Sequence, residues 1–190
     1  MIKRICLLAL FVVLRTLVIS PAIAVEPVPT QGDSVWLHEI RTGVLAHDVD
    51  GLWSGSRKEG GVDFNVEIIF DRPRFLLLLG TVRPNLGLSV NSRADTSKLY
   101  GGLLWELQTR TGVLLDVGLG AAVHDGKLDT RDDDKKSLGS RVLFRIPIEI
   151  GYALNNRHRI SILFDHVSNG YLANPNEGLD TFGLRYGYKF

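Results

Sequence analysis

Strict alternation between apolar and polar residues is the feature of this sequence that most constrains its fold. In the segment 182–190, apolar and aromatic residues occupy every second position up to the C-terminal Phe190, with glycine, arginine and lysine between them. In 142–150, apolar residues alternate in the same way with residues that include Arg145 and Glu149. Because successive side chains of a β-strand point to opposite faces, this pattern predicts strands with one apolar and one polar face.

Eight such strands fit into the chain, and the connections between them alternate in length. The predicted strands are 35–46, 62–70, 75–90, 99–108, 113–123, 139–151, 158–168 and 180–190. The long, polar connections are 47–61, 91–98, 124–138 and 169–179, and the short ones are 71–74, 109–112 and 152–157. Bacterial outer-membrane barrels have an even number of strands, long outer loops and short periplasmic turns. We therefore predict an all-β fold, an eight-stranded antiparallel transmembrane β-barrel of the outer-membrane type, with both termini on the periplasmic side.

A soluble lipocalin-like barrel is the alternative, because its apolar face points inward and alternation alone does not tell inside from outside. The aromatic residues of the last strand and the alternation of loop lengths favour the membrane barrel. The third predicted strand, 75–90, carries the weakest signal. Residues 75–79 are apolar on both faces, and Pro84 interrupts the segment.

The first 24 residues have the features of an export signal. Lys3 and Arg4 precede an apolar run that Arg15 interrupts, and a small-x-small cleavage site ends at position 24. A single membrane-anchoring helix is the alternative, but the interrupted run is too short for it. We therefore predict a signal peptide at 1–24 and a barrel domain at 25–190, exported to the outer membrane.

Cleavage at that point also bounds the chemistry of the mature chain. It removes the only cysteine, Cys6, so neither disulfide nor thiol chemistry is expected. It removes three basic residues and no acidic residue, so the formal net charge moves from +1 to −2. Such a near-neutral balance argues against nucleic-acid binding.

Three side chains that serve together in acyl transfer fall on one predicted face. His166 and Ser168 lie two residues apart on the seventh strand, and Asp180 opens the eighth with the parity of its apolar residues. The 169–179 hairpin brings the two strand ends together, and cross-strand neighbours lie about 5–8 Å apart. In a catalytic triad the serine is the nucleophile, the histidine takes its proton and the carboxylate orients the imidazole. The alternative is a chance polar pair at a barrel rim, with Asp180 as a turn residue.

The loop that follows Ser168 carries groups that suit the same chemistry. Asn169 and Asn176 are candidate donors to a developing oxyanion, to which a good donor contributes about 3 kcal/mol. Gly170 permits a close approach of the backbone or an unusual turn.

Other polar residues have simpler interpretations. His47-Asp48 and His124-Asp125 stand at strand ends, where we expect solvated side chains. A second acid–base pair or a metal site is the alternative, but no third ligand has suitable spacing. Asp165 has the parity of the polar face, so we expect it in the lumen, where a charge change is better tolerated than on the lipid face.

The segment 166–180 resembles the signature of the PagL-type lipid A 3-O-deacylases. The family pattern runs H-x-S-N, then P-N-x-G, then an apolar residue and an acid, and this chain reads HVSN, PNEG, Leu and Asp. The resemblance implies that His166 is the base, Ser168 the nucleophile and Asp180 the acid. It also implies that Asn176 is the oxyanion donor, and Asn169 matches the asparagine that follows the nucleophile. The family acid is a glutamate, so Asp180 departs from the pattern. Glu177 competes for the role, but its parity and loop position argue against it.

The resemblance implies an outer-membrane serine ester hydrolase. Its implied reaction removes the ester-linked 3-hydroxyacyl chain at the 3 position of lipid A in the outer leaflet. The implied partners are lipid A or lipopolysaccharide as substrate and the lipids of the outer membrane. No cofactor, metal or nucleic acid is implied, and the oligomeric state stays open, a monomer being compatible. The alternatives are an outer-membrane phospholipase and a non-catalytic eight-stranded barrel that acts as an anchor or adhesin.

Overall fold

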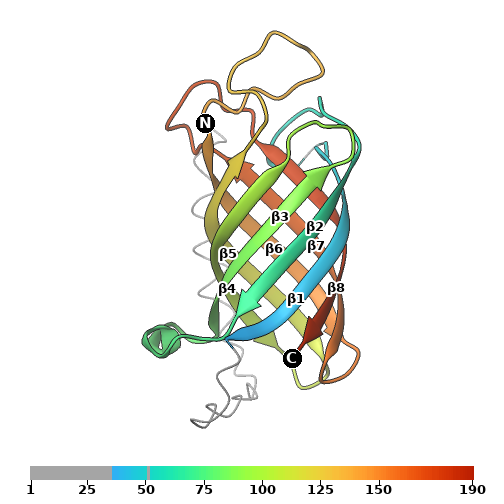
Figure 1. Ribbon diagram of the computed structural model, residues 1–190, viewed down its shortest axis with the longest axis vertical. Coiled ribbons are helices and arrows are strands. Elements are labelled where there is room, and N and C mark those ends of the chain that lie inside the picture. Colours follow the sequence, from blue (N-terminus) through green and yellow to red (C-terminus); the bar gives the residue numbers. More distant parts are fainter. Residues whose placement is uncertain (1–35, 51) are drawn as a thin grey trace.

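The computed structural model describes residues 36–50 and 52–190 and shows a closed barrel of eight antiparallel strands (Figure 1). The strands are β1 (Leu37–Ala46), β2 (Val62–Phe70), β3 (Val82–Asn91), β4 (Lys98–Gln108), β5 (Val113–His124), β6 (Val142–Ala153), β7 (His158–Ser168) and β8 (Leu179–Lys189). Each strand pairs with the next along the chain, and β1 pairs with β8 to close the barrel. The predicted fold class is therefore confirmed.

The bounds of most strands follow the alternation closely, and those of β2 and β7 coincide with the predicted ranges. The third strand was predicted to begin at residue 75, which is wrong. Residues Arg74–Leu79 form a 3₁₀ helix, η2, and β3 begins at Val82. The segment 75–79 has no polar face to turn toward the lumen. Gly80 follows it with a φ of 84°, a conformation that does not continue a strand.

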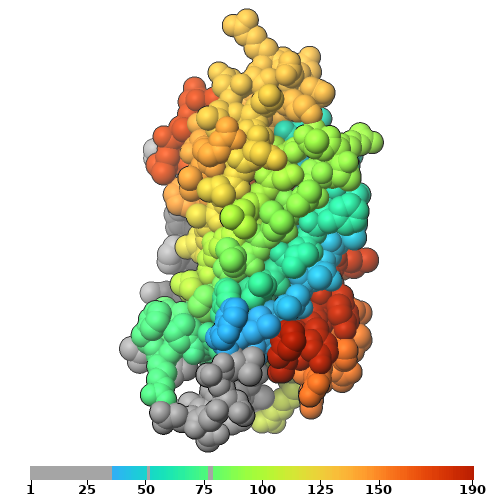
Figure 2. Space-filling model, in the orientation of Figure 1, coloured from blue at the N-terminus to red at the C-terminus, as the bar shows by residue number. Residues whose placement is uncertain are grey.

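The predicted signal peptide, residues 1–24, lies outside the described residues. Within 36–50 and 52–190, no helix has the length and apolar character that a membrane-spanning helix requires. The long loops gather at one end of the barrel, where the β5–β6 and β7–β8 loops rise above its rim (Figure 2). The C-terminus lies at the opposite end (Figure 1).

Large apolar side chains cover the outside of the barrel. Phe64, Leu119 and Leu184 are more than half exposed, and each lies on the apolar face of its strand. At the end with the C-terminus, aromatic rings contact one another on this surface, among them Trp36, Phe70, Tyr186, Tyr188 and Phe190. An apolar exterior with an aromatic girdle is the pattern of an outer-membrane barrel. A soluble barrel with its apolar face inward is therefore excluded.

Charged side chains fill the lumen. Arg41 is fully buried and forms ion pairs of 2.8–3.0 Å with carboxylates of four strands: Glu39, Glu106, Asp116 and Glu149. Arg185 binds Glu67 and Glu149, so the pairs form a network across the barrel. Buried charges are tolerated only when they are paired and hydrogen-bonded, and this network pairs them.

Asp165 shows how closely this lumen is packed. It points inward, as its parity predicted, and is 1% exposed between Lys98 and Arg145, each 2.7 Å away. The expectation that a charge change is better tolerated here than on the lipid face stays a prediction, but the change is not mild, because a cation at position 165 would face the buried cations of Lys98 and Arg145.

We predict that Asp165→Ala lowers the free energy of unfolding by about 3–5 kcal/mol, because it leaves buried cations unpaired. The measurement is denaturant unfolding of the protein refolded into lipid vesicles. Asp133→Ala, which removes an exposed carboxylate from the β5–β6 loop, is the control and should change the free energy by about 0.5 kcal/mol or less. Equal effects of the two changes would contradict a stabilising role of the ion pairs.

Candidate active site

The three predicted triad residues meet at the end of the barrel that carries the long loops. His166 and Ser168 belong to the last three residues of β7, and Asp180 is the second residue of β8. In the pairing of these strands, His166 lies directly opposite Asp180. His166 and Ser168 share the face of the exposed Ile162, so all three side chains lie on the outer wall rather than in the lumen.

The imidazole of His166 joins the other two side chains. Its Nδ1 lies 2.5 Å from Oδ1 of Asp180, and its Nε2 lies 3.0 Å from Oγ of Ser168. A carboxylate on Nδ1 favours the tautomer with the proton on that nitrogen, which leaves Nε2 free to accept the serine proton. Ser168 is half-buried, whereas Asp180 is completely buried. The arrangement is therefore a carboxylate–imidazole–hydroxyl chain that opens to the outside at the hydroxyl.

The β1–β2 loop, residues 47–61, completes the surroundings of Asp180. The second carboxylate oxygen, Oδ2, accepts hydrogen bonds from the backbone N–H groups of Trp53 at 2.6 Å and Ser54 at 2.8 Å. The backbone carbonyl of Asp180 accepts a further bond from the N–H of Val49 at 2.9 Å. The carboxylate thus has donors at both oxygens although it lies on the apolar face of its strand.

Trp53 also covers the imidazole. Its ring packs edge-on against the rings of His166 and Phe164, with centroids 5.2 Å apart in both pairs. This cover explains why His166 is 8% exposed on a face where Ile162 is 46% exposed. Neither alternation nor a motif predicts the roles of Trp53 and Ser54, although Leu52-Trp53 is the one large apolar pair in an otherwise polar loop.

A buried lysine of the β5–β6 loop holds the β1–β2 loop in place. The Nζ of Lys136 lies 3.2 Å from Oδ1 of Asp48 and donates to the carbonyl of Ser56 at 2.7 Å. The other oxygen of Asp48 accepts the backbone N–H groups of Lys58 and Glu59. Loops from two separate hairpins therefore fix the segment that binds Asp180.

His47 forms a second contact beneath the β1–β2 loop. Its Nδ1 lies 2.7 Å from Asp63 and its Nε2 lies 2.9 Å from Glu59, which also accepts the backbone N–H of Lys136 at 3.0 Å. Burial lowers the pKa of His47, but the hydrogen bonds that its ring donates to Asp63 and Glu59 outweigh this effect and raise that pKa to about 9. Burial raises the pKa of Glu59, but the bonds from His47 and Lys136 outweigh it and lower that pKa to about 2. The two groups form a buried ion pair at neutral pH.

The expectation of solvated strand ends at His47 and His124 is therefore wrong. His47 is 1% exposed, and the Nε2 of His124, also buried, lies 2.7 Å from the carbonyl of Ser140. The long loops fold back over the barrel mouth and bury both rings, a tertiary arrangement that local alternation does not reveal.

The two predicted asparagines are held differently. Both amide hydrogens of Asn169 are engaged, because its Nδ2 donates to the carbonyls of Leu138 and Pro175 at 3.0 and 2.8 Å. Asn176 accepts the backbone N–H of Asn169 through Oδ1 at 3.0 Å, and within the described ranges its Nδ2 has no protein partner. Asn169 thus anchors the β7–β8 loop to the β5–β6 loop, whereas Asn176 retains a donor.

Gly170 and Glu177 complete the loop between the strands. Gly170 has a φ of 62°, and a Cβ at this position would lie 3.1 Å from the ring of Phe144, so the turn next to Ser168 favours glycine. Glu177 binds the Nζ of Lys58 at 2.6 Å and the backbone N–H of Ser137 at 2.7 Å. The carboxylate that contacts His166 is therefore that of Asp180.

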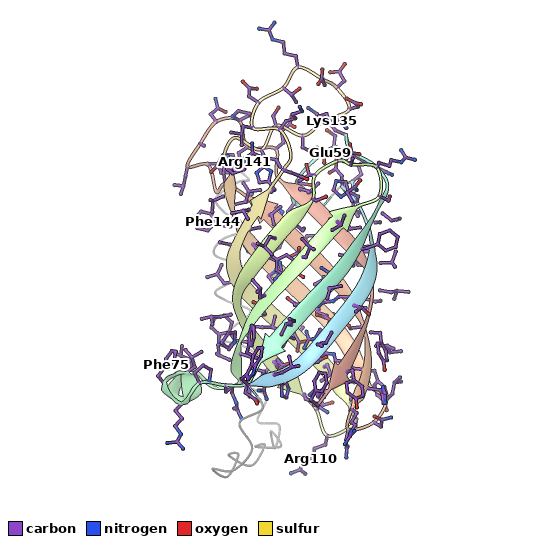
Figure 3. All side chains as sticks on the ribbon, viewed as in Figure 1. Glu59, Phe75, Arg110, Lys135, Arg141 and Phe144 are labelled. Carbon is purple, nitrogen blue, oxygen red and sulfur yellow. The ribbon has the colours of Figure 1, made fainter. Side chains whose placement is uncertain are left out.

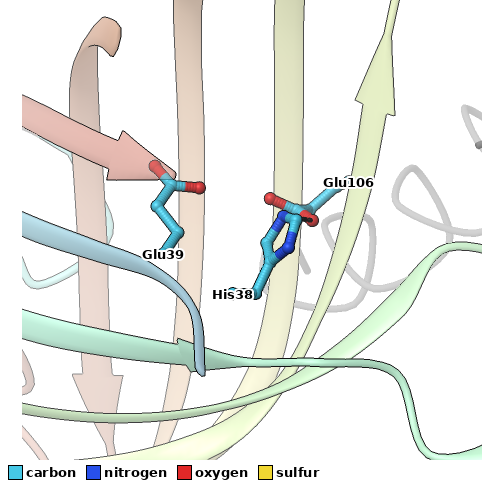
Figure 4. Close-up of side chains that lie close together, drawn as sticks. All are labelled: His38, Glu39 and Glu106. Carbon is cyan, nitrogen blue, oxygen red and sulfur yellow. Dashed lines mark ion pairs between the residues drawn. The ribbon is translucent and has the colours of Figure 1, made fainter. Parts of the chain in front are cut away.

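A metal centre has weaker support. Among the described residues, one group of His, Asp and Glu side chains has ligand atoms close enough for a shared ion: His38, Glu39 and Glu106 (Figure 4). Both carboxylates already bind the guanidinium of Arg41 at 2.8–3.0 Å. The group also lies near the start of β1, at the end of the barrel opposite His166.

We predict that the stability of the β1–β2 loop depends on pH through His47 and Glu59. The pKa of His47 is raised above its ordinary 6.5. The stability that its charged ring gives the loop is therefore complete below pH 6.5 and is lost as the pH rises through about 9. The pKa of Glu59 is lowered from its ordinary 4.5. The stability that its ionised carboxylate gives the loop is therefore complete above pH 4.5 and is lost as the pH falls through about 2. Amide hydrogen-exchange protection of residues 47–61 should therefore decline on both sides of this window.

His47→Gln should remove the alkaline decline in protection, because a neutral amide does not titrate there. His158→Gln, at the opposite end of the barrel, is the control and should retain it. An alkaline decline that persists in His47→Gln would assign the pH dependence to another group.

Comparisons with known proteins agree with this fold and this segment. The family model described as "Lipid A 3-O-deacylase (PagL)" matches residues 85–189, more than half of the chain. Lipid A deacylase PagL of Bordetella bronchiseptica is 36% identical over 76 residues, which are 40% of this chain and 40% of that relative. The alignment therefore spans less than two thirds of the curated relative.

Two solved structures resemble the barrel. The crystal structure of the outer membrane enzyme PagL has a TM-score of 0.57 at 20% identity, covering 78% of this chain and 97% of that one. A de novo designed transmembrane β-barrel has a TM-score of 0.51 at 10% identity, covering 84% and 100%. These likenesses concern the fold, whereas the family follows from the match over β3–β8: the chain belongs to the lipid A 3-O-deacylase (PagL) family.

Proposed function

We propose that this protein is an outer-membrane lipid A 3-O-deacylase that works as a serine ester hydrolase. The observation that carries the proposal is the contact of His166 with both Ser168 and Asp180 on the outer wall of the barrel. Membership of the lipid A 3-O-deacylase family supports the substrate class. An export signal at residues 1–24 would bring the chain to the outer membrane.

In the proposed reaction, Oγ of Ser168 attacks the carbonyl carbon of the ester at the 3 position of the sugar while Nε2 of His166 takes the hydroxyl proton. The resulting imidazolium is stabilised by Asp180. His166 then protonates the leaving sugar oxygen, and a 3-hydroxyacyl group remains on Ser168. Water, deprotonated by the same imidazole, hydrolyses this acyl-enzyme and releases the fatty acid.

The tetrahedral intermediate needs donors for its negative oxygen. Nδ2 of Asn176 and the backbone N–H of Gly170 are the proposed donors, since both lie in the loop next to Ser168. Asn169 acts indirectly, because its side chain holds the loop and its backbone N–H orients the amide of Asn176. Each preorganised donor of this kind lowers the activation free energy by about 3 kcal/mol.

The outward position of the site suits a substrate that never leaves the membrane. Phe144 and Phe182 lie on the outer wall beside Ser168 and Asp180 and are nearly half exposed. An acyl chain in the outer leaflet can pack along such apolar residues while its ester stands at the height of Ser168. A lumen site would be closed to it, because the lumen is filled with ion pairs.

We predict that Ser168→Ala lowers the rate of deacylation by about 10⁴-fold or more, because a triad without its nucleophile does not form the acyl-enzyme. Purified protein is incubated with lipid A, and mass spectrometry detects loss of one 3-hydroxyacyl chain. An unchanged unfolding midpoint shows that the variant is folded. Deacylation by the variant at about a tenth of the wild-type rate would contradict the role of Ser168.

The same assay separates the alternative functions. Release of fatty acid from phospholipid alone would indicate a phospholipase. Release from neither lipid would indicate a barrel without this catalytic activity.

We predict that Asp180→Asn lowers the deacylation rate by about 10⁴-fold, because an amide stabilises the wrong imidazole tautomer and no imidazolium. Glu177→Gln should lower the rate by less than about tenfold, since it weakens one partly exposed ion pair with Lys58. The comparison is made with the lipid A assay at saturating substrate. A larger loss in Glu177→Gln than in Asp180→Asn would transfer the role of the acid to Glu177.

A further inference from the structure

The η2 segment between β2 and β3 differs from the other connections at its end of the barrel. The neighbouring β4–β5 turn, 109–112, is short and ends below the barrel in Figure 3, where Arg110 points away from the wall. η2 instead projects sideways from the wall, as Figures 1 and 3 show, with Phe75 at its outer side. It therefore lies beside the barrel, in the space next to the outer wall.

η2 exposes large apolar side chains. Phe75 is 76% exposed and Leu79 is 54% exposed, whereas Leu76 is 7% exposed. Two large apolar side chains exposed on one six-residue projecting helix are the kind of surface through which a protein contacts other molecules or a membrane.

Two arginines accompany this apolar surface. Arg72 and Arg74 precede Phe75, and residues 72–81 contain no acidic residue. Within 36–50 and 52–190, no carboxylate forms an ion pair with either guanidinium, whereas nearby Asp71 pairs with Arg83. Guanidinium groups bind phosphate oxygens well, because their planar fork matches two of them.

The apolar surface of η2 continues that of the barrel wall. η2 leads into β3, whose outward residue Leu86 is 46% exposed. η2 also lies at the end of the barrel where the aromatic residues Trp36 and Phe70 stack. The bilayer that covers the wall therefore reaches the level of η2. Aromatic and apolar groups at the acyl boundary, with arginines at the headgroups, are the arrangement of an interfacial membrane anchor.

We propose that η2 is such an anchor, which inserts Phe75 and Leu79 among lipid acyl chains at the short-turn end of the barrel while Arg72 and Arg74 bind lipid phosphates. The occupant of this surface is the phospholipid leaflet itself. The inference rests on the location in the outer membrane that forms part of the proposed function, but it is independent of the deacylase chemistry.

Site-directed spin labelling tests the insertion. Cys6 is the only cysteine and is removed with the predicted signal peptide, so Phe75→Cys gives the mature chain from residue 25 a single site for a nitroxide label. The labelled protein is placed in vesicles of phosphatidylethanolamine and phosphatidylglycerol, and collision of the label with apolar oxygen and with a water-soluble nickel complex is measured. Labels at Leu119 on the outer wall and Arg110 in the β4–β5 turn provide the lipid and water references.

The expected result is that the label at position 75 collides more with oxygen than with nickel, as the label at 119 does, while the label at 110 shows the reverse. A label at 75 that behaves like the one at 110 would overturn the anchor and leave the membrane barrel intact. If the label at 119 is also exposed to nickel, the membrane location fails, and the anchor fails with it.

The arginines are tested in the same vesicles. Arg72→Gln together with Arg74→Gln should move the label at Phe75 toward the aqueous values, whereas Arg110→Gln should not. An unchanged accessibility at position 75 in the double arginine variant would overturn the phosphate contacts.

Discussion

The ion-pair network in the lumen is the interaction on which the rest of the structure depends. Strands that turn their apolar side chains outward must place their polar side chains in a space narrow enough to exclude most water. Arg41 and its four carboxylates, and Asp165 between Lys98 and Arg145, show how that space is filled without unpaired charge. Because the interior is occupied in this way, any chemistry on a lipid substrate has to take place on the wall or at the rim.

A site on the wall faces a physical difficulty, because its polar groups lie where lipid would otherwise touch them. His166 and Asp180 extend apolar rows, yet neither is left open to the membrane. Trp53 covers the imidazole with an apolar ring, and two backbone N–H groups of the same loop satisfy the carboxylate. The hydroxyl of Ser168 remains accessible, as a proposed nucleophile must be. The loops thus act as a local substitute for the protein interior that a soluble hydrolase would provide.

The sequence predicts those features that depend on neighbours along a strand. Alternation places His166, Ser168 and Asp180 on one face and Asp165 on the other, because side-chain direction in a strand follows from residue parity. The contact of Trp53 with His166 joins residues 113 positions apart through a loop, and no periodic signal encodes it. The burial of His47 has the same origin, since Glu59 of one loop binds its ring and Lys136 of a second loop binds Glu59. η2 was missed for a different reason: a run of apolar residues reads as a strand until its missing polar face is considered.

The hydrogen bonds between Ser54, Trp53 and Asp180 connect residues 126 and 127 positions apart. They form where the first hairpin meets the last strand, so they exist only in a chain whose β1 and β8 have already paired. A polypeptide on its way to the membrane carries the serine, histidine and aspartate close together in sequence, but without the loop that covers and orients them. Under the proposed function, the triad would therefore be assembled only after the barrel has closed, so the ester hydrolase would be inactive until it has folded in the outer membrane.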